Sequence, residues 1–191
     1  MKQKRGCDKI VQRENERVCC FCGHRPNKFP WGRNELDPRC IYLKSKIADA
    51  VEQAIEDGFS SFITGGAIGT DMWCAECVME AKLRYPKKDI RLILAIPFLD
   101  YARYFSDEEK HRLSLIIDAS DERIITSCEN DMTCVTAKYY KRNEYMVDNS
   151  SRLIAVYNAN LRGGTRYTVE YARKCGIEII FVNWRNNHKG E

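Results

Sequence analysis

Residues 63–71 read Ile-Thr-Gly-Gly-Ala-Ile-Gly-Thr-Asp and join an apolar, strand-like run to a helix-like run. A second turn of this kind, Gly163-Gly164-Thr165, lies between another such pair. A turn of small residues brings backbone N–H groups close to an anion, and the following helix N-terminus carries about half a positive charge. The two turns therefore predict a phosphate site on a fold in which strands and helices alternate.

The alternation extends in both directions from these turns. The expected strands are 17–22, 59–64, 90–96, 123–126, 152–157 and 177–182, and the expected helices are 38–57, 70–84, 107–120, 135–150 and 165–175. This order is typical of a parallel sheet covered by helices on both faces, with ligands bound beyond the carboxyl ends of the strands. We therefore predict a single α/β domain with three layers and a mostly parallel sheet.

Length and charge limit the organisation of the chain. Its 191 residues suit one domain, and a net charge of +4 is too mild to indicate nucleic-acid binding from charge alone. We expect a flexible basic arm over 1–16, the domain over 17–183 and a tail over 184–191. No apolar run approaches the roughly 20 residues of a membrane span or forms a signal-peptide core, so we expect no membrane contact.

Ten cysteines could indicate disulfides, a metal site or reduced thiols. Several lie in expected strands and helices and no secretory signal is present, which favours reduced thiols in the cytoplasm. Cys19 and Cys22 are three apart in a strand, on opposite faces, and so do not chelate one ion. Cys74 and Cys77 share a helical face and either pack there or bind zinc or act in redox chemistry. We expect packing, with no metal and no cofactor.

A series of short motifs along the chain carries a family resemblance. In order, they are Gly23-His24-Arg25-Pro26, Gly65-Gly66-Ala67-Ile68-Gly69-Thr70-Asp71-Met72-Trp73, Ile96-Pro97-Phe98, Arg142-Asn143-Glu144-Tyr145-Met146-Val147-Asp148, Leu153-Ile154-Ala155-Val156-Tyr157 and Gly163-Gly164-Thr165. They closely resemble the YpsA-like branch of the SLOG superfamily, relatives of the DNA-processing protein DprA and the LOG phosphoribohydrolases, over about residues 17–183. The resemblance implies a Rossmann-like (SLOG/DprA-like) domain that binds a nucleotide or nucleotide-derived ligand, without implying one reaction. The turns depart from the G-x-G-x-x-G form, so a standard NAD site is not expected.

Backbone and hydroxyl donors of both turns are assigned to one phosphate. They are Gly65, Gly66, Gly69 and Thr70 at the first helix, and Gly163, Gly164 and Thr165 at the second. The loop at Gly23 supplies Arg25. Both Arg25 and Arg142 have two possible roles: each can bind a phosphate or carboxylate group through two nitrogens, or each can form a surface ion pair. The expected ligand site thus combines two helix N-termini with two arginines.

Three further side chains each have two possible roles. His24 either contacts a base or acts as an acid or base, or it hydrogen-bonds the backbone. Asp71 either accepts from a ribose hydroxyl or caps its helix. Trp73 either stacks on a base or is buried against the sheet or a neighbouring subunit. Tyrosines 139, 140 and 145 near Arg142 are similarly open between ligand contact and core.

The possible activities fall into three classes. In LOG-like hydrolases an arginine and a glutamate assist cleavage of a nucleotide N-glycosidic bond; Arg142 and Glu170 match them by position, but Arg166-Tyr167 replaces the expected Gly-Thr. We therefore prefer a homo-oligomeric protein that binds or senses a nucleotide, with nucleoside monophosphate hydrolysis as the alternative. DprA-like nucleic-acid binding is the third class and has the least support, because no basic and aromatic interleaving marks a strand-tracking groove.

Overall fold

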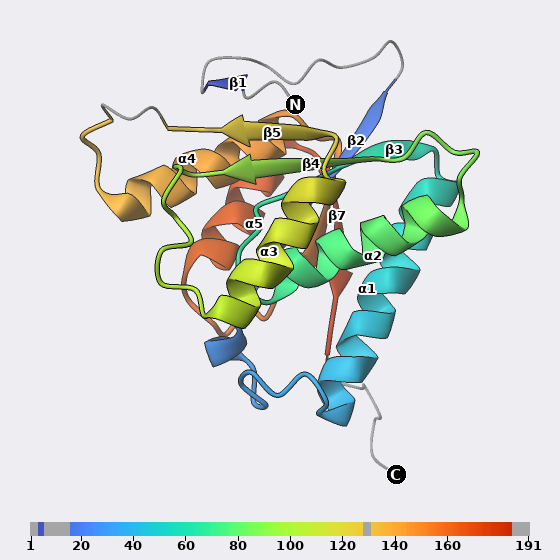
Figure 1. Cartoon of the computed structure of the whole chain (residues 1–191), viewed down its shortest axis with the longest axis horizontal. Coiled ribbons are helices and arrows are strands. Elements are labelled where there is room, and N and C mark those ends of the chain that lie inside the picture. The colour runs from blue at the N-terminus through green and yellow to red at the C-terminus, as the bar shows by residue number, and fades with distance from the viewer. Residues whose placement is uncertain (1–3, 6–15, 128–130, 185–191) are drawn as a thin grey trace.

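A parallel seven-stranded sheet forms the centre of the computed structural model, which describes residues 4–5, 16–127 and 131–184 (Figure 1). All neighbouring strands are parallel, in the order β1-β5-β4-β3-β2-β6-β7. The strands are β1 (Lys4–Arg5), β2 (Arg17–Gly23), β3 (Phe59–Thr64), β4 (Arg91–Ile96), β5 (Glu122–Ile125), β6 (Arg152–Val156) and β7 (Glu178–Val182).

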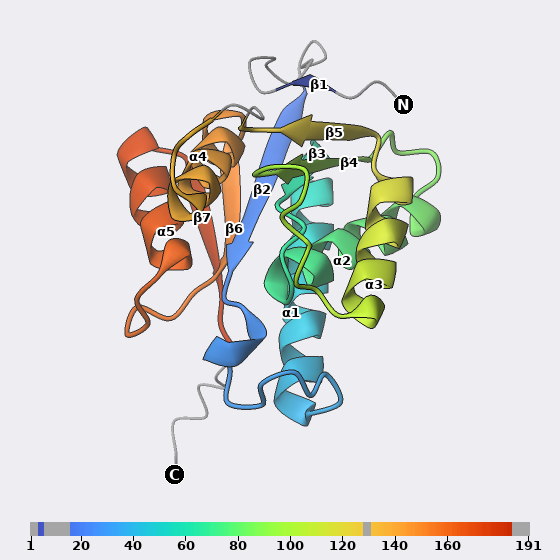
Figure 2. The ribbon, with the colours of Figure 1, turned by 60° about the vertical axis from the view of Figure 1, so that its left-hand side comes forward.

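Helices cover both faces of this sheet. They are α1 (Pro38–Glu56), α2 (Thr70–Arg84), α3 (Asp107–Ala119), α4 (Val135–Asp148) and α5 (Gly164–Cys175). Helices α1, α2 and α3 lie on one face, and α4 and α5 on the other (Figure 2). The three-layer α/β fold with a parallel sheet is therefore confirmed. Within the described residues, no helix combines the length and the apolar character that a membrane crossing requires.

Each face of the sheet has its own apolar core. Leu43 of α1 and Val78 of α2 pack with Phe62 on one face, and Met146 of α4 and Val169 of α5 pack with Ile63 on the other. Successive strand residues point to opposite faces, so Phe62 and Ile63 belong to different cores. Strand β4 is buried along its whole length, which explains its continuous aliphatic sequence.

Local signals fix the ends of several helices. Asp37 accepts a hydrogen bond from the backbone N–H of Arg39 at 2.9 Å and caps α1, whose first residue is Pro38. Ser106 and Glu109 form a reciprocal capping box at the start of α3. Both helices begin at the residues where they were expected.

The ends of the folded body differ slightly from the predicted boundaries. Glu16, assigned to the arm, has a buried side chain whose Oε1 lies 2.8 Å from Nη1 of Arg91. Lys4 and Arg5 form β1, which pairs with β5, and so lie on the sheet edge and not in a free arm. Trp184, assigned to the tail, is buried against Phe29. The remaining arm and tail residues, 1–3, 6–15 and 185–191, lie outside the described residues.

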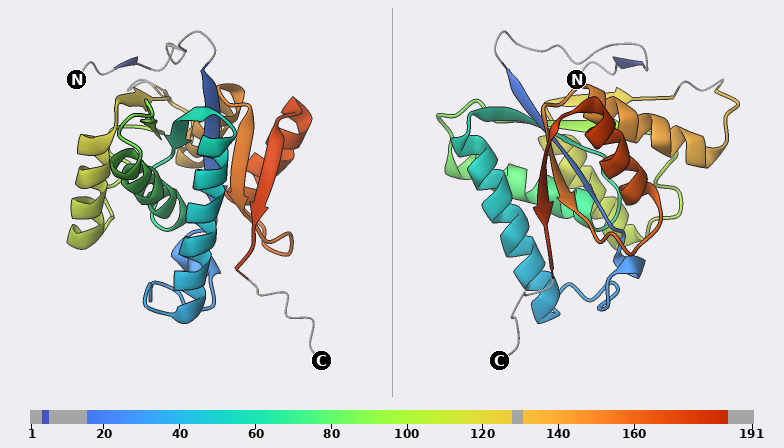
Figure 3. Two further views of the ribbon diagram at one scale, coloured as in Figure 1. Left: turned by 90° about the vertical axis from the view of Figure 1, so that its right-hand side faces the viewer. Right: turned by 180° about the vertical axis from the view of Figure 1, so that it is seen from behind.

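The strand order places a crevice between β2 and β6. From β2 the chain proceeds outward through β3, β4 and β5, whereas β6 and β7 lie on the other side of β2. The connection after β2 runs through α1 on one face of the sheet, and the connection after β6 runs through α5 on the other face. Figure 3 shows β7 at the sheet edge between these two helices. In open α/β sheets ligands bind at the carboxyl ends of the strands where the connections diverge in this way.

Candidate functional site

A cavity of about 310 Å³ opens at this crevice. Its wall combines the end of β2 with the following loop, the turn after β3, one face of α4 and the segment 162–165 at the start of α5. These segments are far apart in sequence and meet because all the strands point the same way. The cavity therefore lies where the strand order predicts a ligand.

The charged residues that line the cavity are mostly cations. Arg25, Lys28, Arg142 and Arg162 face one carboxylate, Asp71, among the described lining residues. Asp71 forms an ion pair with Arg142, and the described residues offer no ion pair to Arg25, Lys28 or Arg162. The cavity consequently attracts anions.

Arg142 and Asp71 form a buried ion pair at the wall of the cavity. Nη1 of Arg142 lies 3.3 Å from Oδ2 of Asp71, and the two residues are 5% and 8% exposed. Burial raises the pKa of Asp71, an effect that the neighbouring Arg142 opposes. Nε of Arg142 is buried and has no hydrogen-bond partner among the described residues. A buried N–H without a partner calls for an explanation, and Arg142 is one of the residues that line the cavity.

The glycines of the first turn mainly contact protein atoms. A Cβ on Gly66 would lie 2.8 Å from the side chains of Leu94 and Tyr101, and Gly66 has φ +62°. A Cβ on Gly69 would lie 2.8 Å from Cδ of Pro26. These glycines allow close packing of the turn against its neighbours.

Of residues 63–71, only Ala67, Ile68 and Asp71 line the cavity. Thr70 donates to the backbone carbonyl of His24 at 3.0 Å and so joins the turn to the loop after β2. The four residues that the sequence assigned to phosphate here, Gly65, Gly66, Gly69 and Thr70, do not line the cavity.

The second turn lies at the cavity, as do five of the other predicted residues. Gly163, Gly164 and Thr165 line it at the N-terminus of α5, and Thr165 donates to the carbonyl of Gly23 at 2.9 Å. The structure thus brings this turn together with Arg142 and a further set of predicted residues: Gly23, His24, Arg25 and Asp71.

His24 and Trp73 are held by protein contacts. Nε2 of His24 accepts a hydrogen bond from the backbone N–H of Asn158 at 3.1 Å, and the ring is 4% exposed. Burial, reinforced by Lys28, lowers its pKa to about 4. The indole of Trp73 is 1% exposed, donates to Glu35 at 2.8 Å and does not line the cavity. These contacts agree with the alternatives in which His24 hydrogen-bonds the backbone and Trp73 is buried.

Glu170 is separate from the other predicted catalytic residue. It is exposed on α5, where its Oε1 accepts from Nε of Arg166 at 2.7 Å. It does not line the cavity, whereas Arg142 does. The structure therefore does not bring Arg142 and Glu170 together around one ligand.

Sequence reasoning did not select six polar lining residues, Asn27, Lys28, Thr136, Asn143, Arg162 and Thr168. Two of them adjoin selected residues, since Asn143 follows Arg142 and Arg162 precedes Gly163. Thr168 lies one helical turn after Gly164, so it shares the cavity-facing side of α5. Lys28 belongs to the 3-10 helix Pro26–Lys28, which no sequence pattern had indicated.

Most of the cysteines that the structure describes are packing residues. Cys19 and Cys22 lie on opposite faces of the sheet, as predicted. Cys74 is buried and Cys77 packs partly buried beside the same core, and burial raises the pKa of both thiols. Over the described parts of the chain, no group of three or more His, Cys, Asp or Glu side chains is placed to hold a metal ion.

Comparisons with known proteins identify relatives of this chain. A model of the YspA SLOG family (YpsA) matches residues 19–181. The uncharacterised SPbeta prophage-derived protein YoqJ of Bacillus subtilis (strain 168) is 35% identical over 148 residues, which cover 72% of this chain and 84% of that protein. A UPF0398 protein of Bacillus thuringiensis (strain Al Hakam) is 25% identical over 160 residues, 84% of each chain.

Two solved structures have a similar fold. DNA processing protein A from Helicobacter pylori, studied for its single-stranded DNA binding mode, superposes with a TM-score of 0.59 at 20% identity, covering 90% of this chain and 67% of that one. DprA from Streptococcus pneumoniae gives 0.57 at 15% identity, covering 87% of this chain and 50% of that one. At these identities the likeness shows the fold.

Proposed function

Because this chain belongs to the YspA SLOG family, we propose that its cavity binds a nucleotide or nucleotide-derived ligand, and that the protein acts by binding or sensing it. One observation carries the proposal: the cavity joins a helix N-terminus to four cations, of which only Arg142 has an ion-pair partner among the described residues. Its volume of about 310 Å³ is at the lower end for small-molecule sites, which suits one nucleotide better than two.

The phosphate is expected at the start of α5. There the backbone N–H groups of 163–165 and the helix dipole favour an anion. Lys28 and Arg162 are exposed side chains in the same lining and can move to the phosphate oxygens. Because Gly65, Gly66, Gly69 and Thr70 do not line the cavity, this proposal places the phosphate at one helix N-terminus and not between two.

The sugar and base are expected toward Arg142 and Asp71. The carboxylate of Asp71 is an acceptor for a ribose hydroxyl, and the guanidinium of Arg142, whose Nε–H has no partner among the described residues, is a donor. Ala67, Ile68 and the ring of Tyr139 add apolar surface for a base. The guanidinium of Arg25 lies 5.3 Å from the centre of the Tyr139 ring, so this end of the cavity offers both cationic and aromatic contacts.

Hydrolysis of the N-glycosidic bond has less support than binding. The reaction needs a carboxylate near the developing charge on the ribose. Glu170 is paired with Arg166 outside the cavity, and Asp71 is already paired with Arg142. We therefore propose binding without base release.

Calorimetry with AMP, GMP, CMP and UMP tests the proposal. At least one of them should bind, and Arg142→Ala and Arg162→Ala should each weaken that binding by about tenfold or more. Arg173→Ala, at an exposed arginine of α5 outside the cavity lining, is the matched control and should not change the affinity.

Single-stranded DNA is the competing ligand, because the fold resembles DprA and the cavity lining holds three cations without an ion-pair partner among the described residues. If an oligonucleotide bound tightly while none of the four nucleotides bound, the nucleotide proposal would be wrong. Homo-oligomer formation and cytoplasmic location stay predictions, which sedimentation and cell fractionation would check.

A further inference from the structure

Asn143 and Thr168 form a hydrogen-bonded relay across the cavity wall. Nδ2 of Asn143, on α4, donates to Oγ1 of Thr168, on α5, at 2.9 Å. Oγ1 of Thr168 donates in turn to the backbone carbonyl of Gly164 at 2.9 Å. Both side chains line the cavity, and Gly164 is the first residue of α5. The relay therefore ends at the proposed phosphate position.

The relay determines which way the amide of Asn143 faces. The carbonyl of Gly164 can only accept, so the single proton of the Thr168 hydroxyl is directed to it. The hydroxyl oxygen must then accept from Asn143, which requires the NH₂ group, and not the carbonyl oxygen, to face Thr168. Without the Thr168 hydroxyl, the NH₂ group of Asn143 loses this acceptor.

The amide has a second N–H that the relay does not use. Nδ2 lies 3.9 Å from the position that a Cβ on Gly164 would take, so the donor end of Asn143 lies beside the first turn of α5. An anion bound at that turn meets an N–H donor, whereas the opposite orientation would present a carbonyl oxygen to it. Asn143 lies next to Arg142 in sequence and on the same cavity, so the two donors can act on one ligand.

We infer that the second N–H of Asn143 donates to a phosphate oxygen of the ligand, that Thr168 is the positioning residue that orients it, and that the site prefers nucleoside monophosphates to nucleosides. The inference rests on the proposed function, since it assumes a phosphate at the start of α5.

The test measures binding of the tightest of the four nucleoside monophosphates and of the matching nucleoside to the full chain by calorimetry. Asn143→Asp has nearly the same shape but places a carboxylate beside the phosphate. It should weaken nucleotide binding by about 10- to 100-fold and change nucleoside binding by less than about twofold. Thr168→Val should weaken nucleotide binding by about fivefold or more. Thr168→Ser, which keeps the hydroxyl, should restore it.

Asn149→Asp is the control for the amide-to-acid change, because Asn149 caps the end of α4 and donates to the carbonyl of Tyr145, outside the cavity lining. Circular dichroism verifies folding, and if Thr168→Val does not fold, Asn143→Asp decides. Unchanged nucleotide binding in Asn143→Asp, or equal losses for nucleotide and nucleoside, would overturn this inference alone. Absence of any nucleotide binding by the wild-type chain would overturn the proposed function as well.

Discussion

Nη1 of Arg142 lies 1.2 Å from the position that a Cβ on Gly65 would occupy. The guanidinium therefore fills the space that any other residue at position 65 would need, and Oδ2 of Asp71 lies 2.5 Å from the same position. A glycine is required here by close approach, since φ at Gly65 is not in the left-handed region. The first glycine turn thus acts on the cavity indirectly, by making room for the Arg142–Asp71 pair.

Gly65→Ala should displace Arg142 and break its ion pair with Asp71. We expect a loss of about 1–3 kcal/mol in the free energy of unfolding, because the new methyl group has no free space. Nucleotide affinity should fall by at least about tenfold, as in Arg142→Ala. Chemical denaturation and calorimetry measure the two effects.

A double-mutant cycle separates this mechanism from general damage to the turn. In an Arg142→Ala background the guanidinium is absent, so Gly65→Ala should cost clearly less stability than it does in the wild-type chain. Equal costs in the two backgrounds would show that Gly65 matters for a reason other than Arg142.

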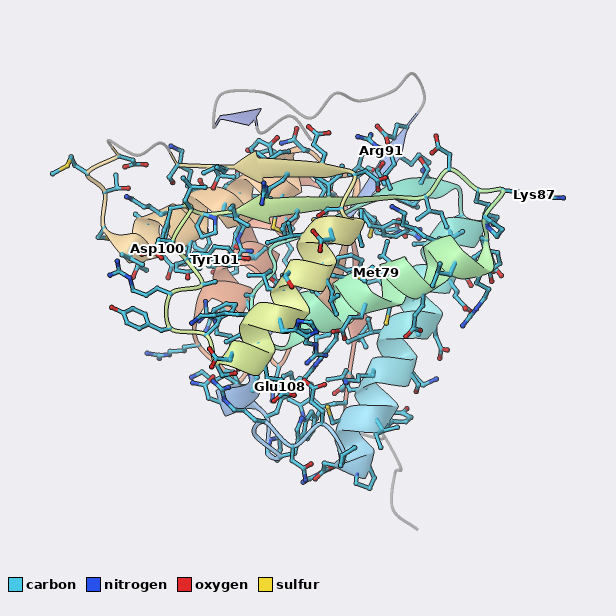
Figure 4. All side chains as sticks on the ribbon, viewed as in Figure 1. Met79, Lys87, Arg91, Asp100, Tyr101 and Glu108 are labelled. Atoms are coloured by element: carbon cyan, nitrogen blue, oxygen red, sulfur yellow. The ribbon has the colours of Figure 1, made fainter. Side chains whose placement is uncertain are left out.

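Gly66→Val should destabilise the fold. Gly66 has φ +62°, where a β-branched residue is strained, and its Cβ would lie 2.8 Å from Leu94 and Tyr101. Figure 4 shows Tyr101 in the loop beyond the carboxyl end of β4, whereas Arg91 lies at the opposite end of that strand. We expect a loss of more than about 2 kcal/mol in denaturant unfolding.

Gly164→Ala provides the contrast in the second turn. Its Cβ would approach only Nδ2 of Asn143, at an ordinary distance of 3.9 Å, so stability should change by less than about 0.5 kcal/mol. The added methyl group lies at the proposed phosphate position, so nucleotide affinity should nevertheless fall. A large loss of stability with unchanged affinity would reverse the roles assigned to the two turns.

The pH dependence of stability should contain a contribution from His24. Its folded pKa, lowered by burial and by Lys28 to about 4, is below the ordinary value of 6.5. The unfolded chain therefore binds the proton more readily, and the contribution of His24 is complete above about pH 6.5 and is lost as the pH falls toward 4.

His24→Gln keeps an acceptor for the N–H of Asn158 but does not titrate. The difference in unfolding free energy between pH 7 and pH 4.5 should accordingly be smaller in this variant than in the wild-type chain. Glu35 stays ionised over this range, because hydrogen bonds from Arg112, Lys44 and Trp73 outweigh its burial and hold its pKa at about 2. An identical pH profile for both chains would show that His24 does not have the low pKa.

The elements of the fold were predictable because local residues determine them. Strand β3 and helix α2 match the expected ranges 59–64 and 70–84, since Gly58 and Gly69 mark their starts. Most strand and helix ends elsewhere differ by one or two residues. The parallel sheet followed from the alternation alone.

The different roles of the two glycine turns could not be predicted from local residues. They depend on Arg142 reaching across from α4 to Gly65, a contact between residues 77 positions apart that no spacing reveals. Likewise, Trp184 joins the core only because the end of β7 lies beside Phe29. Periodicity indicates which face of an element is buried, but not which distant side chain covers it.

Glu170→Gln should leave ligand binding unchanged and should affect no reaction. Glu170 lies outside the cavity lining and accepts from Arg166, so the substitution alters only an exposed ion pair between neighbouring turns of α5. Chromatography of each nucleoside monophosphate after incubation with the protein should detect no free base. Calorimetry should show the same affinity for Glu170→Gln as for the wild-type chain.

Steady release of base would contradict this prediction. If Glu170→Gln then reduced the release by about 10²-fold or more with little change in affinity, the glutamate would act in the transition state and the protein would be a hydrolase. Arg166→Gln is the matched control, because it breaks the same ion pair and leaves the carboxylate in place.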